Sequence, residues 1–153
     1  LADMAKWVKA ARKGLPAYLC RQTSCMYGRR EKTKFRLGRH RLQCSLALRE
    51  TNASSAARDV TCKCCNAGVP ETVAHALFTC PAHDELRESF MERVDDLDVG
   101  FSALDDDKKL KFLMADDTPV KFDNVFYRYL SSLSASRERW LGIPTAQGVG
   151  PRP

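Results

Sequence analysis

One stretch of the sequence decides the fold of this chain, and it reads Cys62-Lys63-Cys64-Cys65-Asn66-Ala67-Gly68-Val69-Pro70-Glu71-Thr72-Val73-Ala74-His75-Ala76-Leu77-Phe78-Thr79-Cys80-Pro81. Two cysteines are separated by two residues, a histidine follows after nine residues, and another cysteine follows after four more. Zinc is bound by thiolates and imidazoles, and a C-x2-C turn presents two thiolates to one side of the ion. Glycine and proline within 66–70 favour a turn that reverses the chain. The spacing therefore predicts one zinc site with Cys62, Cys65, His75 and Cys80 as ligands.

The predicted site is structural. Four protein ligands leave no coordination position for water, so we expect Zn²⁺ to stabilise the fold and not to catalyse a reaction. Cys64 could replace Cys62 or Cys65 in the shell, although two intervening residues favour Cys62 with Cys65. His83 is a rival imidazole that we expect on a helix surface. The competing interpretation is a set of reduced thiols around a core histidine. The chain has seven cysteines, and an odd number fits metal ligation in an intracellular protein better than a disulfide framework.

Charge is distributed unevenly along the chain. Residues 1–49 hold thirteen Lys/Arg and two acids, a net of +11, whereas residues 84–123 hold six Lys/Arg and thirteen acids, a net of −7. A basic half of this kind is typical of a surface that meets a polyanion. We predict phosphate contacts from one cluster of basic side chains: Arg29, Arg30, Lys32, Lys34, Arg36, Arg39, His40 and Arg41. Tyr27 or Phe35 could stack on bases. The competing interpretation of the cluster is a solvated helix face.

Apolar residues recur at helical spacing, and no strand-like alternation of any length occurs. The helical stripes fall at 4–11, 86–97, 110–114 and 122–133, the last continuing toward Trp140. We therefore predict a mostly α fold, a small helical domain stapled by one structural CCHC zinc site. The length of 153 residues is that of one domain. Within it we expect three segments: a basic helical nucleic-acid-binding segment at 1–60, a zinc knuckle with helices at 61–140, and an extended tail at 141–153.

One string suggests catalysis. The run Phe112-Leu113-Met114-Ala115-Asp116-Asp117 is similar to the aromatic-x-Asp-Asp turn of polymerase palms, whose carboxylates hold two metal ions. A two-metal site also needs a carboxylate on a neighbouring strand, and the sequence predicts no strands. No P-loop, G-x-S-x-G or H-E-x-x-H motif occurs. We therefore predict no enzymatic activity, and we expect Asp116 and Asp117 to cap the helix that begins near Pro119.

The C-x2-C pair and the string at 71–81 together resemble the zinc-binding region at the C-terminal end of reverse transcriptases from non-LTR (LINE-like) retrotransposons. Members of that family typically carry C-x2-C followed by E-T-x-x-H-x4-C-P, after a basic segment that ends in a leucine-rich helix. Residues 36–46 are similar to that basic element, and 122–133 are similar to the closing helix. The resemblance implies the same four zinc ligands and contact with RNA or target DNA. The sequence departs from the family at Cys64 and in the acidic run 105–107.

These observations predict a non-catalytic module that binds zinc and nucleic acid, RNA in preference to DNA, and that takes no small-molecule substrate. The resemblance implies a retroelement origin, either within a retrotransposon protein or as an RNA-binding subunit of a larger ribonucleoprotein such as an organellar ribosome. Other proteins of that assembly are expected partners, and the location is intracellular, in the mitochondrion or the nucleus. No run of 18 apolar residues occurs, so no membrane contact is expected. The alternative function is a protein-interaction module whose acidic segment 84–123 docks a basic partner.

Overall fold

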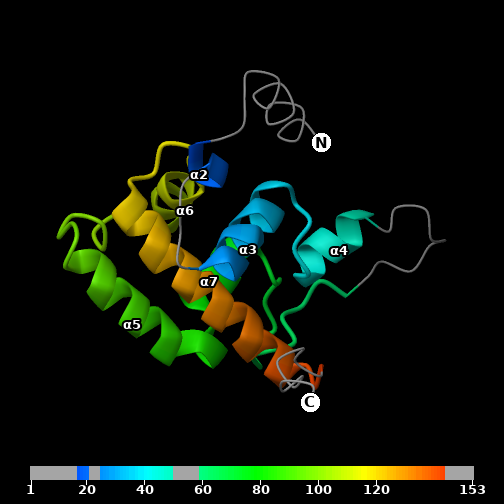
Figure 1. Ribbon diagram of the computed structural model, residues 1–153. Helices are drawn as coiled ribbons and strands as arrows, with labels where there is room; N and C mark the ends of the chain where they lie inside the picture. The colour runs from blue at the N-terminus through cyan, green and yellow to red at the C-terminus, as the bar shows by residue number, and fades with distance from the viewer. Residues whose placement is uncertain (1–16, 21–24, 50–58, 144–153) are drawn as a thin grey trace, which may run out of the picture.

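The computed structural model describes residues 17–20, 25–49 and 59–143 (Figure 1). Its helices are α2 (Ala17–Cys20), α3 (Met26–Arg36), α4 (Gln43–Arg49), the π-helix η1 (His75–Thr79), the 3₁₀ turn η2 (Pro81–His83), α5 (Asp84–Asp95), α6 (Asp106–Met114) and α7 (Val120–Trp140). The described residues contain no strand, only an isolated antiparallel bridge between Thr61 and Pro70. The mostly helical fold class is confirmed. The helix expected at 4–11 and the tail from 144 onward lie outside the described residues.

Helix α7 is the centre of the helix packing. Helices α3, α5 and α6 all contact it (Figure 1). Phe122, Phe126, Leu130 and Leu133 repeat three or four residues apart along α7, and each is buried. This spacing places them on one stripe of the helix. The stripe predicted at 122–133 is therefore a core stripe, and its helix ends at Trp140 as expected.

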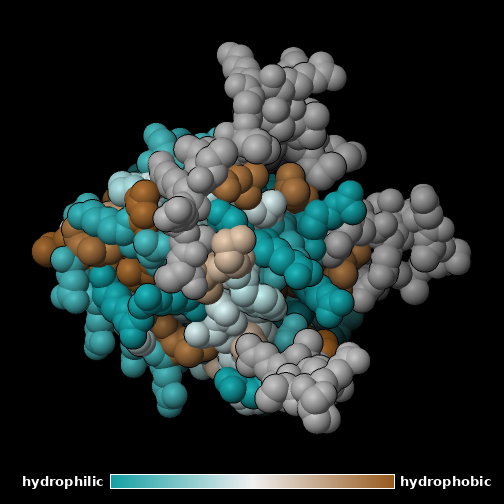
Figure 2. All heavy atoms as spheres, in the orientation of Figure 1, coloured by the Kyte–Doolittle hydropathy of each residue, from teal (hydrophilic) through white to brown (hydrophobic). Residues whose placement is uncertain are grey.

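The core between α5, α6 and α7 is aromatic. Phe90 of α5 stacks on Tyr129 of α7, with ring centroids 4.4 Å apart. Phe101, in the loop before α6, meets the edge of Phe90 at 6.5 Å and packs against Phe122 at 6.4 Å. Aromatic pairs of this kind add to the free energy of apolar burial. Mainly hydrophilic residues cover the other side of α5 (Figure 2).

Helix α3 approaches α7 closely because of one glycine and one buried ion pair. A Cβ atom at Gly28 would lie 1.9 Å from the backbone oxygen of Tyr127, so only glycine permits this separation of the two helices. One turn further on, the Lys32 ammonium donates to Asp123 Oδ1 at 2.7 Å and to the Ala115 carbonyl at 3.2 Å. Both charged side chains are buried, so each depends on the other for its partner.

The N-terminus of α7 lacks the carboxylate cap that the sequence predicted. Its N-cap is Pro119, and no side chain makes a capping hydrogen bond there. Asp116 pairs instead with Arg36 of α3 at 2.5 Å. The turn before α7 is held by Thr118, whose hydroxyl donates to the carbonyls of Phe112 and Ala115. The expectation that Asp116 and Asp117 cap α7 is therefore wrong: no side chain caps this helix, and Arg36, distant in sequence, binds the Asp116 carboxylate.

Candidate metal centre and basic groove

A tight chain reversal brings the first two cysteines together. The Cys62 N–H donates to the Val69 carbonyl at 2.9 Å, and the Glu71 N–H donates to the Val60 carbonyl at 2.8 Å. Between these bonds, Gly68 takes a φ of 66°, a left-handed conformation that residues with a side chain rarely adopt. The reversal leaves Cys62 buried and Cys65 half-buried at its inner side.

A short helix positions the side chains of His75 and Cys80. The Thr72 hydroxyl accepts a hydrogen bond from the His75 N–H at 3.0 Å, which holds the first turn of this helix. From His75 the helix takes π geometry, and the Cys80 N–H donates to the His75 carbonyl at 2.8 Å. Single π turns are rare and occur often at functional sites. This turn sets His75 and Cys80 beside the reversal that carries the C-x2-C pair.

Cys62, Cys65, His75 and Cys80 form one compact donor group. Each offers one ligand atom, and these four atoms lie within 4.8 Å of one another. The Cys62 and Cys80 sulfurs are 3.9 Å apart, and the Cys65 sulfur is 3.5 Å from His75 Nε2. Cys62, His75 and Cys80 are buried. The group could hold one metal ion, and it unites the four residues that the sequence spacing selected.

The orientation of the His75 ring suits a metal ligand. Its Nδ1 lies 3.1 Å from the Thr79 hydroxyl oxygen, and that hydroxyl is 3.5 Å from the His75 carbonyl. When the hydroxyl donates to the carbonyl, its oxygen is free to accept the Nδ1 proton. The lone pair is then on Nε2, which faces Cys65. An outer hydrogen bond of this type fixes the tautomer of a ligating imidazole.

Burial favours the neutral forms of Cys62, Cys80 and His75 when no ion is bound. It raises the pKa of the Cys62 thiol, and it raises the pKa of Cys80 to about 12. Burial also lowers the pKa of His75, which favours the uncharged imidazole. A metal ion requires thiolates, so its binding must release protons from these cysteines.

Cys64 stands beside this group and does not belong to it. It is buried, and its sulfur forms a second potential donor set with Cys62 and Glu71. Burial raises the pKa of Cys64 to about 12. The Glu71 carboxylate in that set is already bound by other residues, so the four-residue group offers the more complete shell.

Glu71 forms a buried network that sequence reasoning missed. Arg137 of α7 donates to both Glu71 carboxylate oxygens, from Nε at 2.7 Å and from Nη2 at 2.9 Å. The Gln43 N–H adds a third hydrogen bond at 2.7 Å. Arg137 Nη2 also donates to the Arg41 carbonyl at 2.9 Å. This network joins the metal loop, which we define as residues 59–83, to α7 and to the basic segment. A glutamate within the cysteine-rich string was its only sequence signal.

His83 corrects another expectation. It is 3% exposed, and its Nδ1 lies 3.3 Å from the Ser136 hydroxyl of α7. Burial and the nearby Arg137 cation lower its pKa. His83 is therefore a buried packing residue and not the helix-surface residue that the sequence suggested, and it is not a member of the metal-ligand group.

Three of the eight basic candidates are buried. Lys32 is fully buried against Asp123, so the expectation that it meets phosphate does not hold for the folded chain. The Arg36 side chain is 5% exposed and pairs with Asp116. His40 is buried and stacks on Phe35, with ring centroids 4.9 Å apart, so that ring is engaged within the chain. Carboxylates of the same chain therefore engage Lys32 and Arg36, and an aromatic ring engages His40.

The remaining candidates reach the surface to different degrees. Arg30, Arg39 and Arg41 are exposed, and none has a side-chain ion pair among the described residues. Lys34 is part-exposed and pairs with Glu31 at 2.5 Å. Arg29 is half-buried and donates to the Leu19 carbonyl at 3.1 Å. Fewer basic side chains are thus available to a ligand than the sequence cluster suggests.

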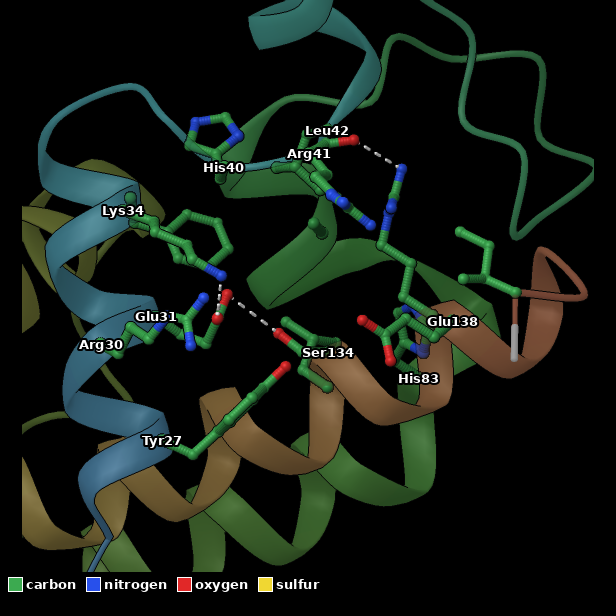
Figure 3. Close-up of a pocket in the computed structure, with 15 residues that line it drawn as sticks. Tyr27, Arg30, Glu31, Lys34, His40, Arg41, Leu42, His83, Ser134 and Glu138 are labelled. Atoms are coloured by element: carbon green, nitrogen blue, oxygen red, sulfur yellow. Dashed lines mark hydrogen bonds and ion pairs between the residues drawn. The ribbon is translucent and has the colours of Figure 1, made fainter. Parts of the chain in front are cut away.

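A groove gathers part of this charge. It lies between α3, the loop before α4 and the C-terminal half of α7, with a volume of about 280 Å³ (Figure 3). Arg30 and Arg41 line it together with the exposed Tyr27 and the acidic Glu138. Figure 3 shows Tyr27 directed toward Ser134 across the groove. The groove therefore combines cations, an aromatic ring and a carboxylate.

Comparisons with known protein families, curated proteins and solved structures find no match for this chain. Among the helices of the described residues, none has both the length and the apolar character needed to cross a bilayer.

Proposed function

We propose that the four-residue group binds one structural Zn²⁺. A tetrahedral zinc site has Zn–S distances of about 2.3 Å and Zn–N distances of about 2.0–2.1 Å, which place two sulfurs about 3.8 Å apart and sulfur about 3.6 Å from nitrogen. The corresponding separations in this chain are 3.9 Å and 3.5 Å. Three thiols and one imidazole match the ligand preference of zinc, and a complete shell leaves no site for catalytic water.

The function of the stabilised module is to bind nucleic acid without catalysis. The observation that carries this proposal is the groove in which Arg30, Arg41 and the exposed Tyr27 lie together. Arginine side chains supply phosphate affinity, and an exposed aromatic ring next to them suits an unstacked base. Unpaired bases are far more common in RNA than in duplex DNA, so RNA is the favoured ligand. Within this proposal the chain is a retroelement-derived part of a larger ribonucleoprotein or of a retrotransposon protein.

A second candidate function is protein interaction through the acidic segment 84–123. Glu85, Glu88 and Glu92 are exposed on α5, whose outer side is mainly hydrophilic (Figure 2). A basic protein could dock there while the metal loop only stiffens the fold. The two functions use different faces, so surface variants can separate them.

Native mass spectrometry of the purified chain tests the zinc proposal. We expect one zinc per chain, lost on treatment with acid and chelator. Cys65→Ser is expected to lose the ion, whereas Cys44→Ser, outside the donor group, is expected to retain it. Absence of metal from freshly purified protein that also fails to take up added Zn²⁺ would contradict the proposal.

Salt-dependent binding of a fluorescent U-rich RNA tests the nucleic-acid proposal. Single-strand binding weakens with a log–log slope of about −0.7 per phosphate neutralised, so removing two cations should make the slope shallower by about 1.4. We expect this change for Arg30→Ala combined with Arg41→Ala. The matched control is Arg93→Ala combined with Arg128→Ala, which removes two exposed arginines outside the groove. Equal slopes for both double variants would exclude the groove, and binding of a basic peptide lost with Glu88→Gln would favour the second candidate.

A further inference from the structure

We propose that the groove recognises one unpaired guanine of a single strand, with the base stacked on Tyr27 and its N1–H and N2–H donors bound by Glu138. This inference rests on the proposed nucleic-acid function and names the ligand of the same groove. Its basis is the juxtaposition of an aromatic ring, two cations and one carboxylate that has no partner in the described part of the chain; these groups lie on two helices and a loop (Figure 3).

The size of the groove suits a single base. Its volume of about 280 Å³ is near the lower end of the range of about 300–1,000 Å³ found for small-molecule pockets. Such a space accepts one nucleotide and excludes a base pair with its two backbones. Single-stranded RNA commonly presents bases that are splayed out and stacked on aromatic side chains.

Tyr27 is the stacking group. It lies on α3 and is 43% exposed, so part of its ring can meet a ligand. The pKa of Tyr27 is raised by burial and by the Glu31 and Glu138 carboxylates, whereas Arg30 and Arg41 oppose this shift. Tyr27 lines the groove together with these cations and acids. Phe35, the other stacking candidate, is already stacked on His40.

Glu138 is the base-reading group. It is half-buried on the wall of the groove, and its carboxylate has no hydrogen bond or ion pair among the described residues. The other acid of the groove, Glu31, is engaged by Lys34 at 2.5 Å and by the Ser134 hydroxyl at 3.3 Å. Glu138 is thus the acceptor that remains for a ligand.

The chemistry of a carboxylate selects guanine. Two acceptor oxygens match two adjacent donors, and guanine presents N1–H and N2–H side by side on its pairing edge. Adenine and cytosine each offer one amino group beside a ring acceptor, which repels the second oxygen. Uracil offers one N–H between two carbonyl oxygens, so it is the least favoured base. Ionised carboxylates also form stronger hydrogen bonds than neutral acceptors do.

The flanking phosphates would meet Arg41 and Arg30. Arg41 is held in place through its backbone, since Arg137 donates to its carbonyl at 2.9 Å and is itself fixed by Glu71. The side chain of Arg41 is exposed and has no ion pair within the described ranges, so it can contact an anion at the rim of the groove. The polar network next to the metal loop therefore positions one wall of the proposed site.

The test measures binding of labelled five-nucleotide RNAs by fluorescence anisotropy. We compare U5, UUGUU and UUIUU, in which inosine keeps N1–H and lacks the amino group. UUGUU is expected to bind about 5- to 150-fold more tightly than U5, the range given by a two-bond base contact, with UUIUU between them. Glu138→Gln should reduce the UUGUU advantage to less than about 3-fold and leave U5 binding intact, because an amide presents only one acceptor. Glu92→Gln, on the exposed face of α5, is the matched control.

The outcomes separate this inference from the function on which it rests. Equal affinities for U5 and UUGUU in the native chain, with salt-dependent binding retained, would overturn the guanine site and leave nucleic-acid binding in place. Binding of none of the three RNAs would overturn both. A guanine preference that survives Glu138→Gln would remove Glu138 from the site. Thermal unfolding of each variant checks that its fold is unchanged.

Discussion

The metal loop and the aromatic core are held together by different forces. In the metal loop the buried side chains include three thiols, two imidazoles and the Glu71 carboxylate. In the core between α5, α6 and α7 the buried side chains are those of phenylalanine, leucine, valine and tyrosine, and Leu77 and Phe78 of the metal loop join this cluster. Apolar burial is additive and tolerant of small changes, whereas coordination and buried charge depend on every member of the set. We therefore expect loss of one member of the set to unfold the whole metal loop, whereas single changes in the core lower the free energy of unfolding in small steps.

On the proposed zinc assignment, loss of the ion is the largest expected effect. Structural zinc contributes about 10–16 kcal/mol of apparent binding free energy in zinc-finger peptides, and without an ion the donor group has only the contacts among its own thiols and imidazole. We expect chelation to expose backbone amides at 61–80 to hydrogen exchange, while amides near the middle of α7 stay protected. The measurement is exchange mass spectrometry with and without chelator. Unchanged protection at 61–80 would show that hydrogen bonds alone maintain the loop.

Deletion of one core ring is the next largest effect. Phe126 is fully buried, and its ring lies 6.0 Å from that of Phe90. Phe126→Ala should lower the free energy of unfolding by about 3–5 kcal/mol, through lost burial and the cavity left behind. Urea unfolding measures this loss, and Phe126→Leu is the milder control. The zinc content should remain one per chain in both variants, so loss of metal from Phe126→Leu would contradict the division into two regions.

The sequence predicted local features better than distant pairings. Apolar spacing at 122–133 anticipated α7 because a helical period repeats within a few residues. The spacing of the cysteines and the histidine anticipated the donor group because its four members lie close together in the sequence. It did not anticipate that Lys32 binds Asp123 or that Arg137 binds Glu71, pairs 91 and 66 residues apart. Which faces of two helices meet is decided by packing of the whole chain, and a charged residue on a helix resembles a solvated one until its partner is known.

Weakening the ion pair between Glu71 of the metal loop and Arg137 of α7 should have a smaller effect on stability. Glu71→Gln removes the negative charge that Arg137 binds and leaves a buried guanidinium with weaker hydrogen bonds. Hydrogen bonds to charged groups contribute about 1.5–3 kcal/mol, so we expect a loss of about 2–3 kcal/mol in urea unfolding. Because Arg137 also holds the Arg41 carbonyl, binding of U-rich RNA should weaken as well. Glu85→Gln, on the surface of α5, is the matched control. An equal loss of free energy of unfolding in that variant would contradict a special role for the buried Glu71–Arg137 pair.

The smallest effect concerns the hydrogen bond from the Tyr129 hydroxyl to the Leu77 carbonyl, 2.6 Å long, which joins the core to the π-helix of the metal loop. Tyr129→Phe should lower the free energy of unfolding by about 1 kcal/mol at pH 8.

Burial raises the pKa of Tyr129 above its ordinary value of 10.0, so folding favours the neutral phenol. Stability from this group is complete below pH 10 and falls as the pH rises above 10, because the unfolded phenol ionises first. Phenylalanine cannot ionise, so the stability gap between the two proteins should narrow between pH 10 and 11 in urea unfolding. A gap that stays constant over this range would mean that the Tyr129 phenol ionises as readily in the folded chain as in the unfolded one.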